Sequence, residues 1–178
     1  MFYTENIQLR KWKETDIPIY HSWRNDPEIT QSTHPTLDVY RYEETKKFYD
    51  EVICASNSKC YMIEHIPDQK PIGVTSLIHI DLYNRQAKCI IDIGEKAYWG
   101  RRYGQEALAI LLRYSFNELG LHRISLKVFE SNSRAIHLYK RIGFVEEGKL
   151  RQSLFRNGRW YDTLLMSLLA PEYKQLNS

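Results

Sequence analysis

The segment from Asn132 to Phe144 constrains the fold of this chain more than any other stretch. Its apolar side chains recur at the spacing i, i+3, i+4, i+7, which places them on one face of a helix. They are Ala135, Leu138, Tyr139 and Ile142. Asn132 stands where an N-cap residue belongs, and Gly143 stands where a C′ glycine ends a helix. The segment therefore predicts one amphipathic helix with a phenol on its apolar face.

Shorter periodic segments, separated by turns, make up the rest of the chain. Further helices are predicted at Glu14–Arg24, Tyr40–Ala55 and Tyr103–Asn117. Alternating segments predict strands at Ile7–Trp12, Cys60–His65, Ile72–Ile80, Ala87–Ile93, His122–Phe129, Phe144–Leu150 and Tyr161–Leu169. Antiparallel strands come first and a strand–helix–strand crossover comes later. We therefore expect one domain over residues 1–178, of the α/β (α+β) class, with a mixed, mostly antiparallel central sheet flanked by helices.

Two turn-forming stretches separate these elements. Asn25-Asp26-Pro27 is predicted to end the first helix, and the loop from Asp26 to Thr30 is expected to line the mouth of a substrate site. A loop with a tight turn at Asn157-Gly158 is expected to join the last two strands.

Composition excludes several classes of protein. The chain has 178 residues, of which 43% are apolar, and no apolar run approaches the roughly 18 residues that span a bilayer. Its start does not have the pattern of a signal peptide, and three cysteines without metal-site spacing indicate reduced thiols. We expect a cytoplasmic protein with no metal and no membrane contact. A balance of 25 basic and 22 acidic residues argues against nucleic acid as the main ligand.

The stretch from Trp99 to Gly104 has the composition of an anion-binding turn. It precedes a predicted helix, whose start presents unpaired N–H groups and a positive dipole end. Gly100 and Gly104 permit a close approach of a ligand, and Arg101 and Arg102 add charge for phosphate oxygens. The alternative is an ordinary helix start with solvated arginines, because many helices begin in this way without a ligand.

Tyr139 and Asn132 also have ordinary interpretations, as a core tyrosine and a helix cap. A functional interpretation is favoured by their position after the anion-binding turn, a helix and a strand. With these elements in this order, the chain resembles the GCN5-related N-acetyltransferase (GNAT) superfamily. One superfamily signature lies over Trp99–Gly104. The other is matched by Asn132, Ala135, Tyr139, Gly143 and Phe144. The resemblance is closest to the branch of ribosomal-protein N-terminal and spermidine acetyltransferases, whose Asn-Gly hairpin is similar to residues 155–162.

This resemblance implies that acetyl-CoA is the cosubstrate. The pyrophosphate would then lie on the backbone amides of Arg101, Arg102, Tyr103, Gly104 and Gln105. The pantetheine arm would pair with the strand formed by Ile91, Asp92 and Ile93, next to Asn132 and Ala135. Arg134 would contact the adenosine phosphate, and Tyr139 would protonate the departing thiolate.

Three positions depart from the superfamily pattern. Trp99 replaces the usual Arg or Gln, and Arg102 replaces the central Gly, so Arg102 is expected to avoid a positive φ. Lys88 stands where related sequences often carry an acid, which leaves the general base unassigned. Candidates for a proton relay are Glu28, Glu64, His34 and His79, and Glu28, His34 and His79 are also the candidates for acceptor binding.

The missing base affects the choice of acceptor. Neutralising an amine of pKa near 10.4 at pH 7 costs about 4.6 kcal/mol, whereas an α-amino group costs only about 1 kcal/mol. A protein N-terminal α-amine is therefore the first expectation, spermidine or another small amine the second, and an antibiotic or amino sugar the third. A CoA-binding module without catalysis is the alternative from another class. A homo-oligomer is possible if Phe155, Trp160 and Tyr161 form a subunit contact instead of core.

Overall fold

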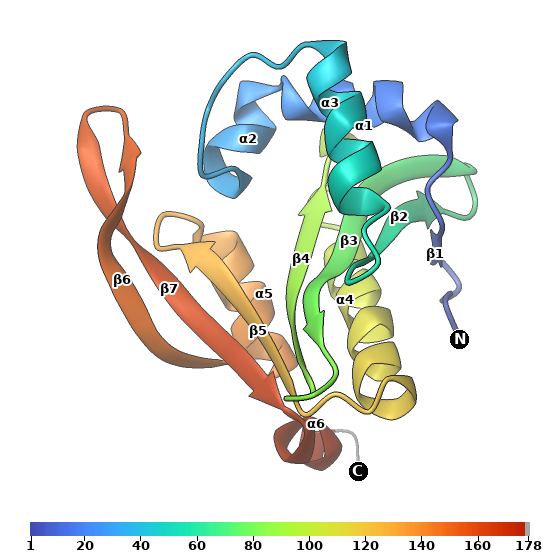
Figure 1. Cartoon of the computed structure of the whole chain (residues 1–178), viewed down its shortest axis with the longest axis vertical. Coiled ribbons are helices and arrows are strands. Elements are labelled where there is room, and N and C mark those ends of the chain that lie inside the picture. Colours follow the sequence, from blue (N-terminus) through green and yellow to red (C-terminus); the bar gives the residue numbers. More distant parts are fainter. Residues whose placement is uncertain (177–178) are drawn as a thin grey trace.

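The computed structural model describes residues 1–176, and one sheet of seven strands runs through them (Figure 1). The strands lie in the order β1-β2-β3-β4-β5-β7-β6. Only β4 and β5 are parallel neighbours among the strands of this sheet, and the other pairs are antiparallel. The expected mixed, mostly antiparallel sheet is confirmed. The strands are β1 (Ile7–Arg10), β2 (Lys59–His65), β3 (Lys70–Asp81), β4 (Gln86–Ile93), β5 (Arg123–Phe129), β6 (Val145–Arg156) and β7 (Arg159–Leu169).

Six α-helices are present in the described part of the chain. They are α1 (Ile17–Arg24), α2 (Pro27–Thr33), α3 (Tyr42–Phe48), α4 (Tyr103–Arg113), α5 (Ser133–Ile142) and α6 (Ala170–Leu176). Figure 1 shows α1, α2 and α3 gathered at one end of the sheet, away from α6. Short 3₁₀ turns lie at Glu14–Asp16 and Lys96–Tyr98, and single π-helical turns extend α3 to Ile53 and α4 to Glu118. None of the helices in residues 1–176 is both long and apolar enough to cross a membrane.

Helix α2 corrects the loop that was expected from Asp26 to Thr30. The first helix does end before Pro27, but the chain restarts at once as a second helix. The Asp26 carboxylate caps it by accepting a hydrogen bond from the Glu28 amide at 2.9 Å, and Pro27 occupies the first helical turn. A capping aspartate followed by proline is a helix start as well as a helix stop. The short helix α6 was also not predicted.

The last two strands are longer than expected, and the loop between them is a tight hairpin. Asn157 and Gly158 both have positive φ, 48° and 76°. A two-residue turn of this kind matches the twist of paired strands, so pairing continues to Arg156 and Arg159. The segment from residue 151 to 156, expected as loop, is therefore strand.

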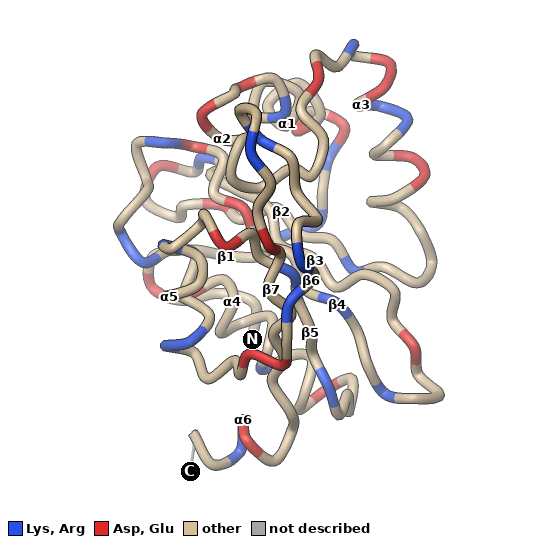
Figure 2. The backbone as a smooth tube through the Cα atoms, turned by 90° about the vertical axis from the view of Figure 1, so that its left-hand side faces the viewer, with Lys and Arg blue, Asp and Glu red and all other residues tan. Residues whose placement is uncertain are grey.

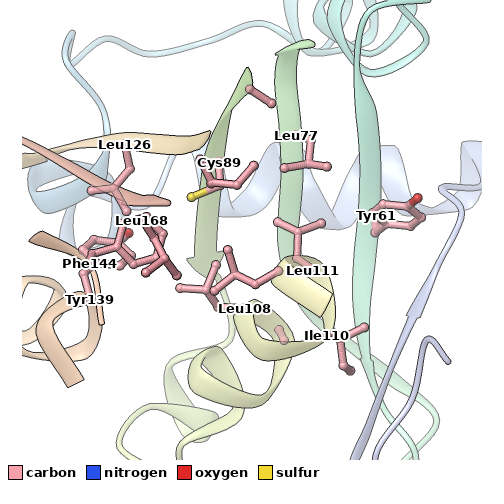
Figure 3. Packing of buried hydrophobic residues seen from close by; sticks show 14 of the residues in the cluster. Tyr61, Leu77, Cys89, Leu108, Ile110, Leu111, Leu126, Tyr139, Phe144 and Leu168 are labelled. Carbon is pink, nitrogen blue, oxygen red and sulfur yellow. The ribbon is translucent and has the colours of Figure 1, made fainter. Parts of the chain in front are cut away.

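The two faces of the sheet pack against different helices. The larger core cluster includes Cys89 of β4 and Leu108 and Leu111 of α4, and Figure 3 shows these side chains close together. A smaller cluster joins Trp23 and Ile29 to Met62 and Val74. Because side chains alternate along a strand, the cross-strand partner of Val74 belongs to the second face. That partner is Asp92, and Ile90 and Lys88 follow on the same face.

The parallel pair β4–β5 is short, and this positions the functional site. Pairing covers only Gln86–Lys88 of β4 and Arg123–Ser125 of β5. Beyond these residues the two strands separate, as Figure 1 shows. The sheet is thus divided into two leaves, one formed by β1–β4 and the other by β5, β7 and β6. Among the described residues, the backbone of β4 from Cys89 onward has no strand partner on its β5 side.

Candidate active site

A cavity of about 690 Å³ lies where β4 and β5 separate. Cys89–Ile93 of β4 and Leu126–Phe129 of β5 line its two long sides. The start of α4 and the helix α5 also contribute residues, and α2 contributes Ile29, Ser32 and Thr33. The free edge of β4 can pair with an extended molecule as a neighbouring strand would. This agrees with the position predicted for Ile91, Asp92 and Ile93, all three of which line the cavity.

The turn before α4 contributes Gly100 and Arg102 to the lining, and the first turn of α4 contributes Tyr103, Gly104 and Gln105. Arg101 is not among the lining residues, and its guanidinium lies over the Tyr98 ring at 5.8 Å. The expectation that Arg102 avoids a positive φ is wrong, because its φ is 65° and its ψ is 6°. A left-handed residue at a helix start turns successive N–H groups toward one point, which favours an anion. The conformation costs about 1–2 kcal/mol in a residue with a side chain.

Helix α5 has the cap that its sequence predicts. The Asn132 side-chain oxygen accepts a hydrogen bond from the Ala135 amide at 3.1 Å, and its amide group donates to the Ser32 carbonyl at 3.1 Å. Gly143, at φ 110°, ends the helix. Asn132 therefore fastens α5 to α2 across the cavity. Asn132 and Ala135 both line the cavity, but their contact with a pantetheine arm stays a prediction.

Two cations of the same helix line the cavity. Arg134 stacks over the Trp99 ring at 4.3 Å, which joins α5 to the turn before α4. Arg141 also lines the cavity. The aromatic residue that replaces the usual Arg or Gln at position 99 thus holds an arginine in place.

Tyr139 lies on the inner face of α5 and lines the cavity. Its residue is 7% exposed, and its ring packs edge-on against Phe144 at 5.8 Å (Figure 3). Its hydroxyl has no hydrogen-bond partner in residues 1–176. Burial raises the pKa of Tyr139 far above its ordinary value, and the charges of Cys89 and Asp92 raise this pKa further. The phenol therefore keeps its proton at neutral pH.

Asp92 is the only carboxylate among the described residues that line the cavity. It lies on the sheet face that carries the smaller cluster, and no hydrogen bond or ion pair joins it to another described residue. Burial raises the pKa of Asp92 to about 7. Sequence reasoning treated Asp92 only as part of a backbone edge. The sequence does place this carboxylate inside the apolar run Ile90-Ile91-Asp92-Ile93. Burying an unpaired acid destabilises a fold, so an acid in such a run is a candidate functional residue.

The other candidates from the sequence lie in different places. His79 and Lys88 line the cavity, and His79 sits at a strand irregularity with φ 52°. Glu28 and Glu64 are outside the lining and form ion pairs, with Lys96 at 2.8 Å and with Arg10. His34 is outside it too, 2.9 Å from the Thr33 hydroxyl, and burial is the main cause that lowers its pKa.

No group of three or more metal-ligating side chains comes together within residues 1–176. The three thiols are free, with Cys54 exposed and Cys60 and Cys89 buried. Figure 2 shows basic and acidic positions interspersed over the elements, so neither sign of charge gathers on one end of the molecule.

The geometry can be compared with known proteins. The Acetyltransferase (GNAT) domain family matches residues 6–145. An uncharacterised N-acetyltransferase, p20, from Bacillus licheniformis is 30% identical over 173 residues, which are 96% of this chain and 97% of that protein.

Solved structures with the same fold include two of spermidine N-acetyltransferase from Vibrio cholerae. Its crystal structure in complex with CoA and spermine has a TM-score of 0.86 at 30% identity, and the match covers 96% of this chain and 99% of that one. A dodecameric structure of the same enzyme in an intermediate state has a TM-score of 0.82 at 28% identity, with coverage of 98% and 100%.

Proposed function

Because the chain belongs to the GNAT acetyltransferase family, and is therefore an N-acetyltransferase that uses acetyl-CoA, we propose that it acetylates a primary amine of a small molecule. The observation that carries this proposal is the pairing of a carboxylate with a phenol in one cavity. Asp92 comes from β4 and Tyr139 from α5, and both line the space where the strands separate. A base and an acid at one cavity are what amine acetylation needs.

The residues present fit the cosubstrate. The free edge of β4 suits an extended pantetheine arm, and the start of α4 suits phosphates. Arg102 at the start of α4 and Arg134 and Arg141 of α5 add positive charge to the cavity lining. Bound acetyl-CoA supplies the reactive thioester, and the protein's residues orient it and manage the protons.

The proton transfers follow from the two ionisable side chains. Asp92 takes a proton from the acceptor ammonium, and the neutral amine then forms its bond to the acetyl carbon as the carbon–sulfur bond breaks. Tyr139 gives its proton to the leaving sulfur, whose thiol has a pKa of about 8.5, and the resulting phenolate takes the second proton that the nitrogen loses as the amide forms. A carboxyl group with a pKa of about 7 is largely ionised only above neutral pH, so it is a stronger base than an ordinary aspartate. Asp92 fills the role that the sequence left unassigned.

This assignment weakens the physical reason for preferring a protein N-terminal α-amine. That preference rested on the absence of a base, and a positioned base lets a strongly basic amine react. The relatives compared above favour the small-amine alternative, because two of the matching structures are of a spermidine N-acetyltransferase. A polyamine is therefore the second, more specific candidate for the acceptor.

The test is an acetyl-transfer assay with a panel of amines. Release of CoA thiol and a mass increase of one acetyl group are measured with spermidine, other small amines and peptides that have free N-termini. Acetylation of at least one small amine, faster than of any peptide, is the expected result. Turnover restricted to peptide N-termini would contradict the proposal, and CoA binding without turnover on any amine would favour a binding module.

We also propose that the chain forms a homo-oligomer, as the dodecameric relative does. Phe155 and Trp160 support this proposal, because they are 53% and 59% exposed and pack together at 5.0 Å on the β6–β7 hairpin. Tyr161 beside them is only half-exposed. A cytoplasmic location stays a prediction that rests on the cysteine composition.

A further inference from the structure

The positive charge of the cavity is not confined to its phosphate side. Five Lys or Arg residues line it within the described chain, against the single carboxylate of Asp92. Arg102, Arg134 and Arg141 belong to the side formed by α4 and α5. The remaining two, Lys88 and Lys127, come from the strands.

Strand pairing places Lys88 and Lys127 on one face of the sheet. Lys88 pairs with Ser125 of β5, so these two side chains point to the same face. Lys127 lies two residues beyond Ser125 and returns to that face. Asp92 is four residues beyond Lys88 on β4, also on that face. The two lysines thus lie where the strands begin to separate, and the backbone of Lys88 is about 13 Å along β4 from that of Asp92.

Both lysine side chains are available to a ligand. Lys88 and Lys127 are exposed, and neither forms an ion pair or hydrogen bond with another residue in the described part of the chain. His79 lines the cavity beside them.

Asp81, an acid outside the lining of the main cavity, forms no ion pair with either lysine. Asp81 shares a smaller neighbouring cavity of about 380 Å³ with His79 and Lys88. However, its carboxylate accepts hydrogen bonds from the Tyr83 amide at 3.0 Å and from the Asn84 side chain at 2.7 Å.

These charges have a consequence for the acceptor. A polyamine that presents one amine to Asp92 must leave its other ammonium groups in the cavity, where no other described lining residue is an acid. Like charges in a confined, partly desolvated space repel, and opposite charges attract. We infer that the natural acceptor is a primary amine that also carries a carboxylate or a phosphate, with its amine at Asp92 and its anion at Lys88 and Lys127. This inference rests on the proposed function and specifies its substrate class, with an anionic amine in place of the polyamine candidate.

The first test compares probes that differ in one charged group. Cadaverine and L-lysine differ by a carboxylate, and glucosamine and glucosamine 6-phosphate differ by a phosphate. We expect kcat/KM for the anionic member of at least one pair to be higher by about tenfold or more. The two pairs distinguish a carboxylate acceptor from a phosphate acceptor. A wild-type preference for cadaverine, glucosamine or spermidine over both anionic probes would overturn the inference.

The second test reverses the charge of the two lysines. The double variant Lys88→Glu, Lys127→Glu should lose the preference for the anionic probe and gain about tenfold or more in kcat/KM for spermidine. The single variant Lys127→Glu should shift both values in the same directions by less. Lys174→Glu on α6, an exposed lysine outside the cavity lining, is the matched control and should change neither value.

Thermal unfolding and acetyl-CoA binding establish that each variant is folded. An unchanged acceptor preference in the folded double variant would overturn the inference while leaving the proposed acetyl transfer intact. Failure of the wild-type protein to acetylate any amine would overturn the proposed function, and the inference with it.

Discussion

Asp92 and Tyr139 are ordinary residue types that acquire their chemistry from burial. The Asp92 carboxylate has no donor among the described residues, so burial favours its neutral form and raises its pKa to about 7. The same cause raises the pKa of Tyr139, which keeps its proton. One side chain can thereby accept a proton near neutral pH, and the other is fully protonated before the reaction.

Replacing Asp92 tests its role as the base. Asp92→Asn should lower kcat/KM by roughly 10²-fold or more, the usual contribution of a positioned base. In the wild-type protein, kcat/KM should rise with pH as Asp92 loses its proton, with a midpoint near pH 7, and this limb should be absent in the variant.

Unfolding provides an independent readout of the same carboxylate. The folded pKa of Asp92 lies above its unfolded value, so the unfolded state binds fewer protons and ionisation destabilises the fold as pH rises from about 4 through 7. Asp92→Asn should therefore be more stable than the wild type at pH 8 and similar at pH 4. If Asp92→Asn kept the wild-type dependence of kcat/KM on pH, the assignment of Asp92 as the base would be contradicted.

Replacing Tyr139 by Phe tests the acid without changing the packing. Tyr139→Phe keeps the ring against Phe144, so the variant should not melt below the wild type, and its Kd for acetyl-CoA should stay within about twofold of the wild-type value. Because the proton donor is lost, kcat should fall by about tenfold to 10³-fold. Phe144→Leu, a change in the neighbouring ring, is the control for packing and should affect stability more than kcat. Wild-type rates in Tyr139→Phe would remove the hydroxyl from the mechanism.

At the scale of elements, the start of α4 and the separation of β4 from β5 build the cavity. The left-handed Arg102 turns the chain into α4 at the point where phosphates are expected. The Asn132 cap fixes the start of α5 and fastens it to α2 through Ser32. The short β4–β5 pairing leaves residues 89–93 of β4 without a strand partner on the β5 side. Each of these features is local, but together they define one cavity between elements that lie far apart in the sequence.

The strain at Arg102 leads to a prediction about stability. Arg102→Gly should stabilise the fold by up to about 1 kcal/mol, because glycine adopts a positive φ without a side-chain clash. It should also weaken acetyl-CoA binding several-fold by removing a charge from the cavity. Arg101→Gly, one residue earlier and without a positive φ, should not stabilise the protein. Urea unfolding and a CoA titration of both variants measure the two effects, and equal stability changes would contradict the strain argument.

At the scale of the whole molecule, the two leaves of the sheet share the core under α4, while the β6–β7 hairpin extends away from it (Figure 1). The exposed rings of Phe155 and Trp160 lie near the end of this hairpin. An exposed aromatic pair leaves apolar surface in water when the chain is isolated. Burying this pair against another copy of the chain would remove that surface from water and stabilise an oligomer.

The proposed oligomer can be tested on this hairpin. Phe155→Ser, Trp160→Ser should reduce the mass measured by light scattering to that of a smaller assembly and leave the melting curve cooperative. Tyr83→Ser, which removes an exposed aromatic ring from the β3–β4 turn, is the matched control and should leave the mass unchanged. A wild-type protein that is monomeric at all concentrations would contradict the oligomer.

Most of the local structure follows from the sequence alone, because it depends on periodicity and on caps. The α5 helix is predicted from apolar spacing with Asn132 and Gly143 at its ends, and the anion-binding turn from glycine and arginine before a helix. The same local rules failed at α2, where Asp26-Pro27 both ends one helix and starts another, and at Arg102, where the tertiary arrangement imposes a conformation that its residue type disfavours.

The sequence by itself therefore determined the helices with clear caps, and its two motifs in order gave the family resemblance from which acetyl-CoA and the candidate role of Tyr139 were predicted. Only the tertiary structure decided which carboxylate lines the same cavity as the phenol of Tyr139. Asp92 and Tyr139 are 47 residues apart, and burial, which raises the pKa of Asp92 to about 7, exists only after β4, α1 and α2 have packed. The charge around the acceptor was decided in the same way, because Lys88 and Lys127 become neighbours only through the register of two strands.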